Sequence, residues 1–307
     1  MEVSEDADGQ RIDNFLLRHL KGVPRGHLYR MLRKGEVRVN KGRIKADYRV
    51  RTGDLVRIPP VRIETSAKAP PSEGLRARLE GALLYEDERL IVLDKPAGMA
   101  VHGGSGVNAG VIEALRALRP EEKHLELVHR LDRETSGCLL ISKRSSVLRT
   151  LHELIRKNRV DKRYLALLAG SWRKGARRVE VPLKKNTLQS GERVVRVDAE
   201  GKPAETRFRR LVRYTDATLV EVELITGRTH QIRVHSAWLG SPVLGDDKYG
   251  DTGANRAMRE LGLRRLFLHA HQLRFRWPGE ARETCFEAPL PETLAACLER
   301  LEKFDEV

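Results

Sequence analysis

The chain has 307 residues and a formal net charge of +15 at pH 7, from 58 Lys and Arg against 43 Asp and Glu, and a positive field of this size favours a polyanionic partner such as nucleic acid. Its three cysteines have no short paired spacing, which argues against a disulfide framework and a thiolate metal site. The sequence lacks an apolar run of about 18 residues that could span a membrane, and the acidic, polar start MEVSEDADGQ is unlike a signal peptide, so we expect a cytoplasmic protein without membrane contact.

Two helices and a few short strands are predicted within residues 1–60. Apolar residues fall on one helical face in 11–20, and a second amphipathic helix is predicted over 25–35, where Gly35 ends it. Alternating Val and basic residues surround a turn in 37–42, and 53–58 predicts another strand. These elements predict a small N-terminal domain of helices and a β-hairpin.

Positive charge is concentrated in this N-terminal segment. Residues 21–57 hold twelve Lys and Arg against three acids, an excess of nine. For an isolated charge run, a solvated face is the ordinary interpretation, but here basic residues recur on the polar side of every predicted element. Through YRMLRKGEVRVNKGRIK the segment resembles the alpha-L (S4-like) RNA-binding domain. That resemblance implies RNA contacts by Arg25, Tyr29, Arg30, Arg33, Lys34 and Lys41.

A linker and a larger domain follow. Four prolines lie between residues 59 and 74, which is typical of an extended tether, so we expect a linker over 61–78 and a second domain over 79–307. Its predicted strands are 89–96, 137–143, 163–170 and 218–226, and its predicted helices are 111–119, 145–158 and 291–304. This mixture indicates an α+β fold with a mixed or antiparallel sheet.

Several common site signatures fail in the second domain. HELIRK resembles a zinc-protease motif, but Arg156 stands where the second histidine ligand belongs. HGGSG lacks the Lys and Ser or Thr of a phosphate-binding loop, and no G-x-S-x-G turn supports a serine nucleophile. His269 and His271 have no acidic or thiolate companion nearby in sequence, so we expect no metal site.

Three polar segments beside apolar strands remain as candidates. They are LDKPAGMAVHGG (93–104), HRLDRETSG (129–137) with DKRYLAL (161–167), and ITGRTHQIRVH (225–235). A capped turn with an ion pair would explain any one of them. In this order and spacing, over about residues 83–289, the segments resemble the RNA pseudouridine synthases that act on large-subunit ribosomal RNA.

This resemblance implies a catalytic role for Asp132. Pseudouridylation detaches uracil from ribose, turns it and rejoins it through carbon five. An ionised carboxylate can act as nucleophile on the sugar or the base, or can stabilise and deprotonate a transient sugar species. The sequence does not distinguish these routes. The resemblance further implies that Arg130 fills the stack vacated by a flipped uridine, that Tyr164 stacks on the uracil and that Arg233 is the ion-pair partner of Asp132.

Secondary roles follow from the same resemblance. Arg228 and His230 are expected to contact phosphate or to support their loop, and Lys95 and His102 are expected at the pocket edge. The substrate would be 23S ribosomal RNA and the protein a monomer. No cofactor is expected, because isomerisation involves no net redox change.

Two other functions stay open. The N-terminal domain alone would suit a non-catalytic RNA-binding or ribosome-assembly protein. A single reactive carboxylate would suit a nucleosidase, although such enzymes usually employ paired acids and the only close acid is Glu134. Release of free uracil would distinguish hydrolysis from isomerisation.

Overall fold

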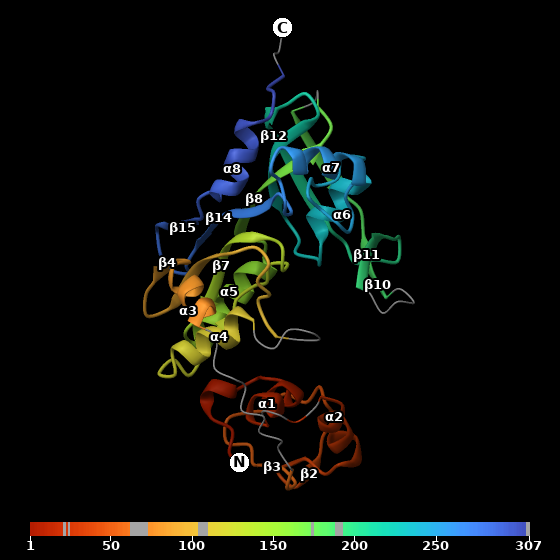
Figure 1. The fold of residues 1–307 in the computed structure, drawn as a ribbon. Coiled ribbons are helices and arrows are strands. Elements are labelled where there is room, and N and C mark those ends of the chain that lie inside the picture. Colours follow the sequence, from red (N-terminus) through yellow and green to blue (C-terminus); the bar gives the residue numbers. More distant parts are fainter. Residues whose placement is uncertain are drawn as a thin grey trace. The chain divides into compact units, whose positions relative to one another are not determined.

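The computed structural model describes residues 1–20, 23, 25–61, 73–103, 110–172, 175–187 and 193–304. It divides into two compact units, Met1–Ala69 and Pro70–Val307 (Figure 1). Most of the expected linker, residues 62–72, lies outside the described residues.

The N-terminal unit has the predicted helices and hairpin. Its elements are η1 (Glu5–Ala7), α1 (Ile12–His19), α2 (Arg25–Lys34), β1 (Arg38–Val39), β2 (Gly42–Arg43) and β3 (Val56–Arg57). The strands pair in the order β2-β1-β3. Asn40 and Lys41 both have positive φ, 48° and 69°, as the tight turn of a two-residue hairpin requires. Buried apolar residues from α1, α2 and the strands form its separate core.

A large sheet organises the second unit, and the α+β class is confirmed. Along the sheet the order is β4 (Leu83–Glu86), β5 (Leu90–Lys95), β7 (Ser136–Ser142), β14 (Leu268–Arg276), β8 (Val160–Ala169), β13 (Ala217–Leu224), β12 (Glu205–Arg213) and β9 (Ala176–Glu180). In addition, β6 (Glu126–Leu127) pairs with β7, and β15 (Glu283–Glu287) pairs with β14. Among the described strands, β7 and β14 form the parallel pair and the others are antiparallel. A separate hairpin joins β10 (Leu183–Thr187) to β11 (Arg193–Val197).

The helices of this unit are only partly as predicted. They are α3 (Glu73–Glu80), α4 (Val111–Leu118), α5 (Ser145–Arg156), α6 (Gln231–Trp238), α7 (Thr252–Glu260) and α8 (Glu292–Glu299). The helices predicted over 111–119 and 145–158 are confirmed, whereas the last helix ends at Glu299 and α6 and α7 were not predicted. The expectation that 73–78 belongs to an extended tether is wrong, because these residues begin α3, whose Leu79 is buried in the main core.

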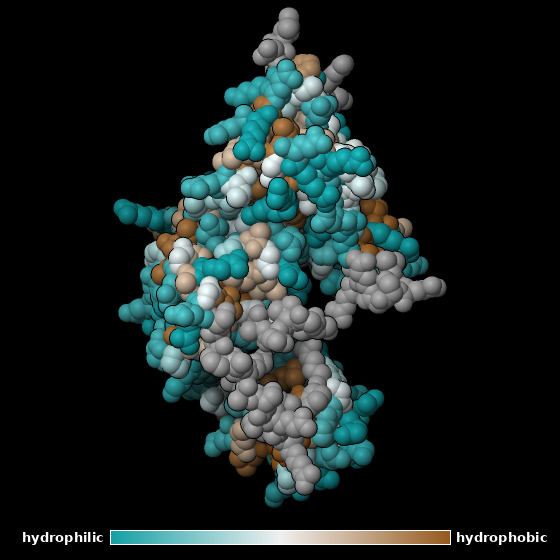
Figure 2. Space-filling view, in the orientation of Figure 1, coloured by the Kyte–Doolittle hydropathy of each residue, from teal (hydrophilic) through white to brown (hydrophobic). Residues whose placement is uncertain are grey.

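The second unit has separate clusters of buried apolar side chains beneath a charged surface. The largest core gathers side chains from β5, β7, β8, β13 and α4, and a second packs α5 against β7 and β14. Hydrophilic residues dominate the visible face in Figure 2, with scattered apolar patches between them. None of the helices in the described part of the chain has the length and apolar content needed to cross a bilayer.

Gly137 allows β7 to pair in parallel with β14. Its φ is +111°, and a Cβ at this position would lie 2.3 Å from the carbonyl oxygen of Ala270, its register partner. We expect Gly137→Ala to lower the free energy of unfolding by about 2 kcal/mol or more, because a strained φ and a backbone clash combine. Urea denaturation checks this. Gly74→Ala is the control: a Cβ there meets open space within α3, so its stability should be equal or slightly higher. Equal stability of both variants would contradict the clash.

Candidate active site

The loop that carries Asp132 connects β6 to β7 and is tied to the segment after β5. Gly98 N donates to Arg133 O at 2.8 Å, and Arg133 Nε donates back to Gly98 O at 3.0 Å. Lys95 Nζ donates to the same Arg133 carbonyl at 3.1 Å. Arg133, for which the sequence suggested no role, therefore helps to hold the two loops together. The residue next to Asp132 is thereby fixed from two sides.

A second loop brings the start of α6 to the same place. His230 precedes α6 in the left-handed region, with φ 54°. Gln231 fixes the loop, since its Oε1 accepts from Arg228 N at 3.0 Å and from Thr226 Oγ1 at 2.7 Å. Its Nε2 donates to Glu205 O on β12 at 2.9 Å. The turn before α6 is thus anchored to the sheet through one buried amide.

The two loops meet around a cavity of about 80 Å³. It is lined by Arg130, Leu131, Asp132, Thr135, Tyr164, Leu224, Gly227, Arg228, His230, Gln231, Ile232, Arg233 and Leu268. We call this the catalytic cavity. Asp132 Oδ2 lies 3.6 Å from Arg233 Nη1 and 3.9 Å from His230 Nε2. Residues about a hundred positions apart in sequence therefore surround one half-buried carboxylate.

The main partner of Arg233 is Asp246, which the sequence did not predict. Arg233 Nε donates to Asp246 Oδ2 at 2.7 Å, and Nη2 donates to Asp246 Oδ1 at 2.8 Å. The ion pair with Asp132 exists but is longer than a hydrogen bond. Arg233 thus bridges two carboxylates, and its bidentate bond with Asp246 sets its orientation. The only available signal was the acid-rich turn GDDKYG after an apolar pair, which does not reveal a long-range partner.

Burial and charge act together on these groups. Burial alone would lower the pKa of Arg233, but its hydrogen bond to Asp246 and the charges of both acids raise the pKa above the usual value. Burial alone would raise the pKa of Asp246, but Arg233 lowers it overall. Burial raises the pKa of Tyr164, and the charge of Asp132 raises it further. Burial lowers the pKa of His230 despite the opposing effect of Asp132. A fixed cation therefore faces Asp132, next to a neutral phenol.

The expectation that Lys95 lies at the pocket edge is wrong. Lys95 is fully buried and is not among the residues that line the catalytic cavity. Besides Arg133 O, its ammonium donates to the carbonyls of Pro96 and Met99, both at 2.9 Å. Burial is the main reason that its pKa falls to about 7. Lys95 therefore ties the Asp132 loop to the segment that follows β5.

We expect Lys95→Met to reduce both stability and kcat, because the carbonyls of Pro96 and Met99 lose their donor and the Asp132 loop loses one of its ties to the segment after β5. Unsatisfied buried groups cost about 1 to 3 kcal/mol each. Lys143→Met is the control, since Lys143 lies at the end of β7 and pairs with Glu86 and Glu122 instead. Denaturation and steady-state kinetics at saturating RNA should show a stability loss in both variants but a fall in kcat only in Lys95→Met. An unchanged kcat in the folded Lys95 variant would refute the positioning role.

Of the other predicted site residues, Arg130, Arg228 and Tyr164 line the catalytic cavity and His102 does not. Arg130 and Arg228 are exposed at the rim of the catalytic cavity, and Arg228 Nε also donates to Pro203 O at 3.1 Å. Tyr164 is buried and contributes to the cavity wall from β8. His102 is exposed and does not line the cavity, so the structure gives no support to its expected place at the pocket edge.

In the N-terminal unit, the predicted RNA contacts lie on α2 and on the β1-β2 turn. The exposed members are Tyr29, Arg30, Arg33, Lys34 and Lys41. The side chain of Arg25 lies outside the described part of the structure. The Tyr29 hydroxyl also donates to Asp13 on α1 at 2.8 Å, which holds α2 against α1.

The two histidines on β14, His269 and His271, contact other side chains and backbone groups of the fold. His269 is buried, with Nδ1 2.9 Å from Ser136 Oγ and Nε2 3.2 Å from Ala288 O. His271 lies 3.7 Å from Glu221. The described residues include no group of three or more His, Cys, Asp or Glu that could hold a metal ion.

Comparison with known families assigns both units. Residues 89–238 match the RNA pseudouridylate synthase model, and residues 10–56 match the S4 domain model. The first range contains Asp132, Tyr164 and Arg233.

Comparison with individual proteins agrees over nearly the whole chain. Ribosomal large subunit pseudouridine synthase C of Haemophilus influenzae is 56% identical over 303 residues, which is 98% of this chain and 94% of that protein. The protein of the same name from Escherichia coli strain K12 is 55% identical, covering 97% and 95%. Among solved structures, human RNA pseudouridylate synthase domain containing 4 has a TM-score of 0.61 at 30% identity, covering 75% of this chain and 97% of that chain. Human RNA pseudouridylate synthase domain containing 1 has a TM-score of 0.58 at 26% identity, covering 73% and 88%.

Proposed function

The chain belongs to the RNA pseudouridylate synthase family, and on this premise we propose that it converts uridines of 23S ribosomal RNA to pseudouridine with Asp132 as the catalytic carboxylate. The relatives named above carry the ribosomal large subunit in their names. The observation that carries the proposal is the catalytic cavity itself: inside the range matched by the family model, Asp132 faces the fixed cation Arg233 and the buried ring of Tyr164.

The proposed reaction needs an anionic group beside the glycosidic bond. During isomerisation the bond from N1 of uracil to the ribose breaks, the bond from C5 forms, the C5 proton leaves and N1 regains a proton. Arg233 Nη1 lies 3.6 Å from Asp132 Oδ2 and supplies a fixed positive charge beside it. Asp132 can then act on the sugar or the base. No cofactor is part of this proposal.

The target uridine must leave the RNA stack to reach Asp132. Unstacking costs a few kcal/mol, which protein contacts must offset. We assign Arg130, exposed at the cavity rim, to the vacated place in the stack. We assign the Tyr164 ring to the uracil, where stacking contributes about 1 to 3 kcal/mol. Arg228 at the rim would contact phosphate, and His230 would support the loop beside Asp132.

The N-terminal unit supplies general RNA affinity in this proposal. Its exposed basic residues on α2 and the β1-β2 turn suit contacts with phosphate, which dominate nucleic-acid affinity and weaken with salt. We propose that the protein acts as a monomer in the cytoplasm. Light scattering after gel filtration measures its mass, and a stable dimer would contradict that part.

The purified chain and unmodified 23S ribosomal RNA provide the test. Carbodiimide mapping should reveal pseudouridine at a small number of positions, and free uracil should not accumulate. Binding without any new pseudouridine would favour a non-catalytic RNA-binding protein. Release of uracil would favour a nucleosidase. Comparing maps from cells with and without the gene then identifies the target positions.

A further inference from the structure

Tyr249 lies in the segment between α6 and α7 and contacts both basic side chains that face Asp132. Its hydroxyl oxygen is 2.8 Å from His230 Nδ1, and the two rings meet edge to face with their centroids 5.5 Å apart. The guanidinium of Arg233 lies 5.0 Å from the centroid of the Tyr249 ring. Tyr249 itself does not line the catalytic cavity, so any effect on the reaction must pass through the side chains that it contacts.

The Tyr249 hydroxyl also accepts a hydrogen bond from the β10-β11 hairpin. Val195 N, on β11, donates to it at 2.9 Å. Figure 1 shows this hairpin beside α6, and Val195 shares a small apolar cluster with Val234 of α6, against which Tyr249 packs. The backbone of β11 and the packing of the ring therefore fix the position of the hydroxyl.

These contacts decide the direction of the hydrogen bond between Tyr249 and His230. A phenol has one proton to donate and an oxygen that accepts, and burial raises the pKa of Tyr249, so the phenol keeps its proton. Because the oxygen already accepts from Val195 N, this proton is available to His230 Nδ1. Burial lowers the pKa of His230, so its ring is neutral at pH 7 and Nδ1 can accept the bond.

The other nitrogen of the His230 ring leads to the same assignment. In a neutral imidazole one nitrogen carries the proton and the other accepts, so an accepting Nδ1 places the proton on Nε2. His230 Nε2 faces Asp132 Oδ2 at 3.9 Å. The carboxylate attracts an N–H at this place and repels a nitrogen lone pair. Both neighbours of the ring therefore favour the tautomer with the proton on Nε2.

We propose that Tyr249 is a positioning residue that holds His230 in the Nε2–H tautomer, so that His230 presents a neutral N–H donor to Asp132 when the substrate is bound. This inference rests on the proposed function, because it concerns the carboxylate assigned to the reaction. The present distance of 3.9 Å is longer than a hydrogen bond, and catalytic hydrogen bonds often shorten when the substrate binds.

Nitrogen NMR of the chain with isotope-labelled histidine reads the tautomer directly. At about pH 8, above the ordinary pKa of His, the ring signals of His230 should show a protonated Nε2 and an unprotonated Nδ1. Their absence from the spectrum of His230→Asn identifies them. In Tyr249→Phe, which keeps the ring but lacks the hydroxyl, the two signals should move toward each other as the second tautomer becomes populated. A protonated Nδ1 in the unmutated chain, or an unchanged tautomer balance in Tyr249→Phe, overturns the proposal.

Kinetics with 23S ribosomal RNA measure what the tautomer contributes to catalysis. Tyr249→Phe should lower kcat about fivefold to tenfold, the factor that corresponds to one lost hydrogen bond. KM should stay unchanged, because Tyr249 does not line the cavity. In a His230→Asn background, where Asn suits the left-handed backbone of this position, Tyr249→Phe should cause no further loss of kcat. Equal losses in both backgrounds would show that Tyr249 acts independently of His230, which overturns the proposal.

Tyr85→Phe is the matched control, because the Tyr85 hydroxyl also bonds a neighbouring side chain, Asp87 at 3.0 Å, and Tyr85 does not line the catalytic cavity. Its kcat should equal that of the parent, and a loss as large as that of Tyr249→Phe overturns the assignment. Thermal unfolding establishes that each variant is folded. The unmutated chain keeps the two failures apart: if it forms no pseudouridine the proposed function fails, whereas if it does and Tyr249→Phe changes neither the tautomer nor kcat only this inference fails.

Discussion

Asp132→Asn is expected to abolish pseudouridine formation, by roughly four orders of magnitude or more, as removal of an essential catalytic group does. The amide keeps the shape of the side chain but cannot be ionised, so it can neither attack nor accept a proton. Affinity for 23S ribosomal RNA should be unchanged or slightly higher, because the loss of one negative charge removes a repulsion from phosphate. Single-turnover assays with carbodiimide mapping measure the first effect, and filter binding measures the second.

Glu134→Gln provides the control for charge. Glu134 is exposed, two residues from Asp132, and pairs loosely with Arg133 at 3.6 Å. We expect its activity to stay within about twofold of the parent, because an exposed ion pair of this kind contributes little. Undiminished turnover in folded Asp132→Asn would refute the proposed mechanism. Equal losses in both variants would instead indicate a general electrostatic effect of the loop.

Arg233→Gln should have the second largest effect, on both stability and catalysis. The side chain is one-tenth exposed and Asp246 is fully buried, so its loss leaves both the buried Asp246 and Asp132 without this cation. Breaking such a pair from one side costs about 3 to 5 kcal/mol. Loss of a fixed charge beside the reacting atoms commonly lowers kcat by about two to three orders of magnitude. Urea denaturation and saturating kinetics on the same preparation separate the two effects.

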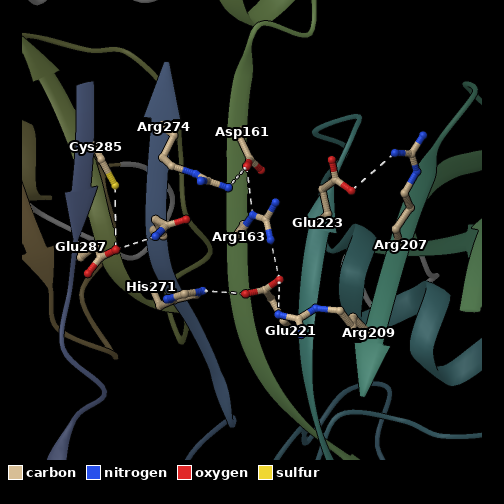
Figure 3. Close-up of polar contacts among 11 residues, drawn as sticks. Asp161, Arg163, Arg207, Arg209, Glu221, Glu223, His271, Arg274, Cys285 and Glu287 are labelled. Carbon is tan, nitrogen blue, oxygen red and sulfur yellow. Dashed lines mark hydrogen bonds and ion pairs between the residues drawn. The ribbon is translucent and has the colours of Figure 1, made fainter. Parts of the chain in front are cut away.

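Variants of the same network distinguish orientation from charge. Arg233→Lys keeps the charge but cannot bond both oxygens of Asp246 while facing Asp132, so we expect an intermediate kcat. Asp246→Asn should also reduce kcat without a change in KM, because a residue as buried as Asp246 does not contact the RNA. Arg209→Gln is the control, since Arg209 is exposed, pairs with Glu221 (Figure 3) and does not line the catalytic cavity. Normal kcat in folded Arg233→Gln would contradict the role of Arg233.

The sequence indicated which segments line the cavity, because the patterns that mark these segments are local. The HRLDRETSG, DKRYLAL and ITGRTHQIRVH segments each lie beside an apolar strand, and their order along the chain was enough to suggest the family. The long-range partners were harder. The acid-rich turn around Asp246 does not reveal its partner, and only the packing of α6 against this turn places the carboxylate beside Arg233. Lys95 stood in a recognisable segment, yet its burial depends on which loop covers it.

The sequence alone was enough to predict two units and an α+β fold and to suggest Asp132 as a candidate, because charge density, apolar periodicity and motif order are properties of neighbouring residues. Which groups meet depends on the tertiary structure. It placed α3 in a segment expected to be extended, because Leu79 can be buried there. It made Arg233 a bridge between two acids and turned Lys95 into a buried tie between loops. These outcomes depend on strand pairings between segments that are far apart in the sequence. The free energy of these pairings comes from long-range contacts, which a local sequence pattern does not reveal.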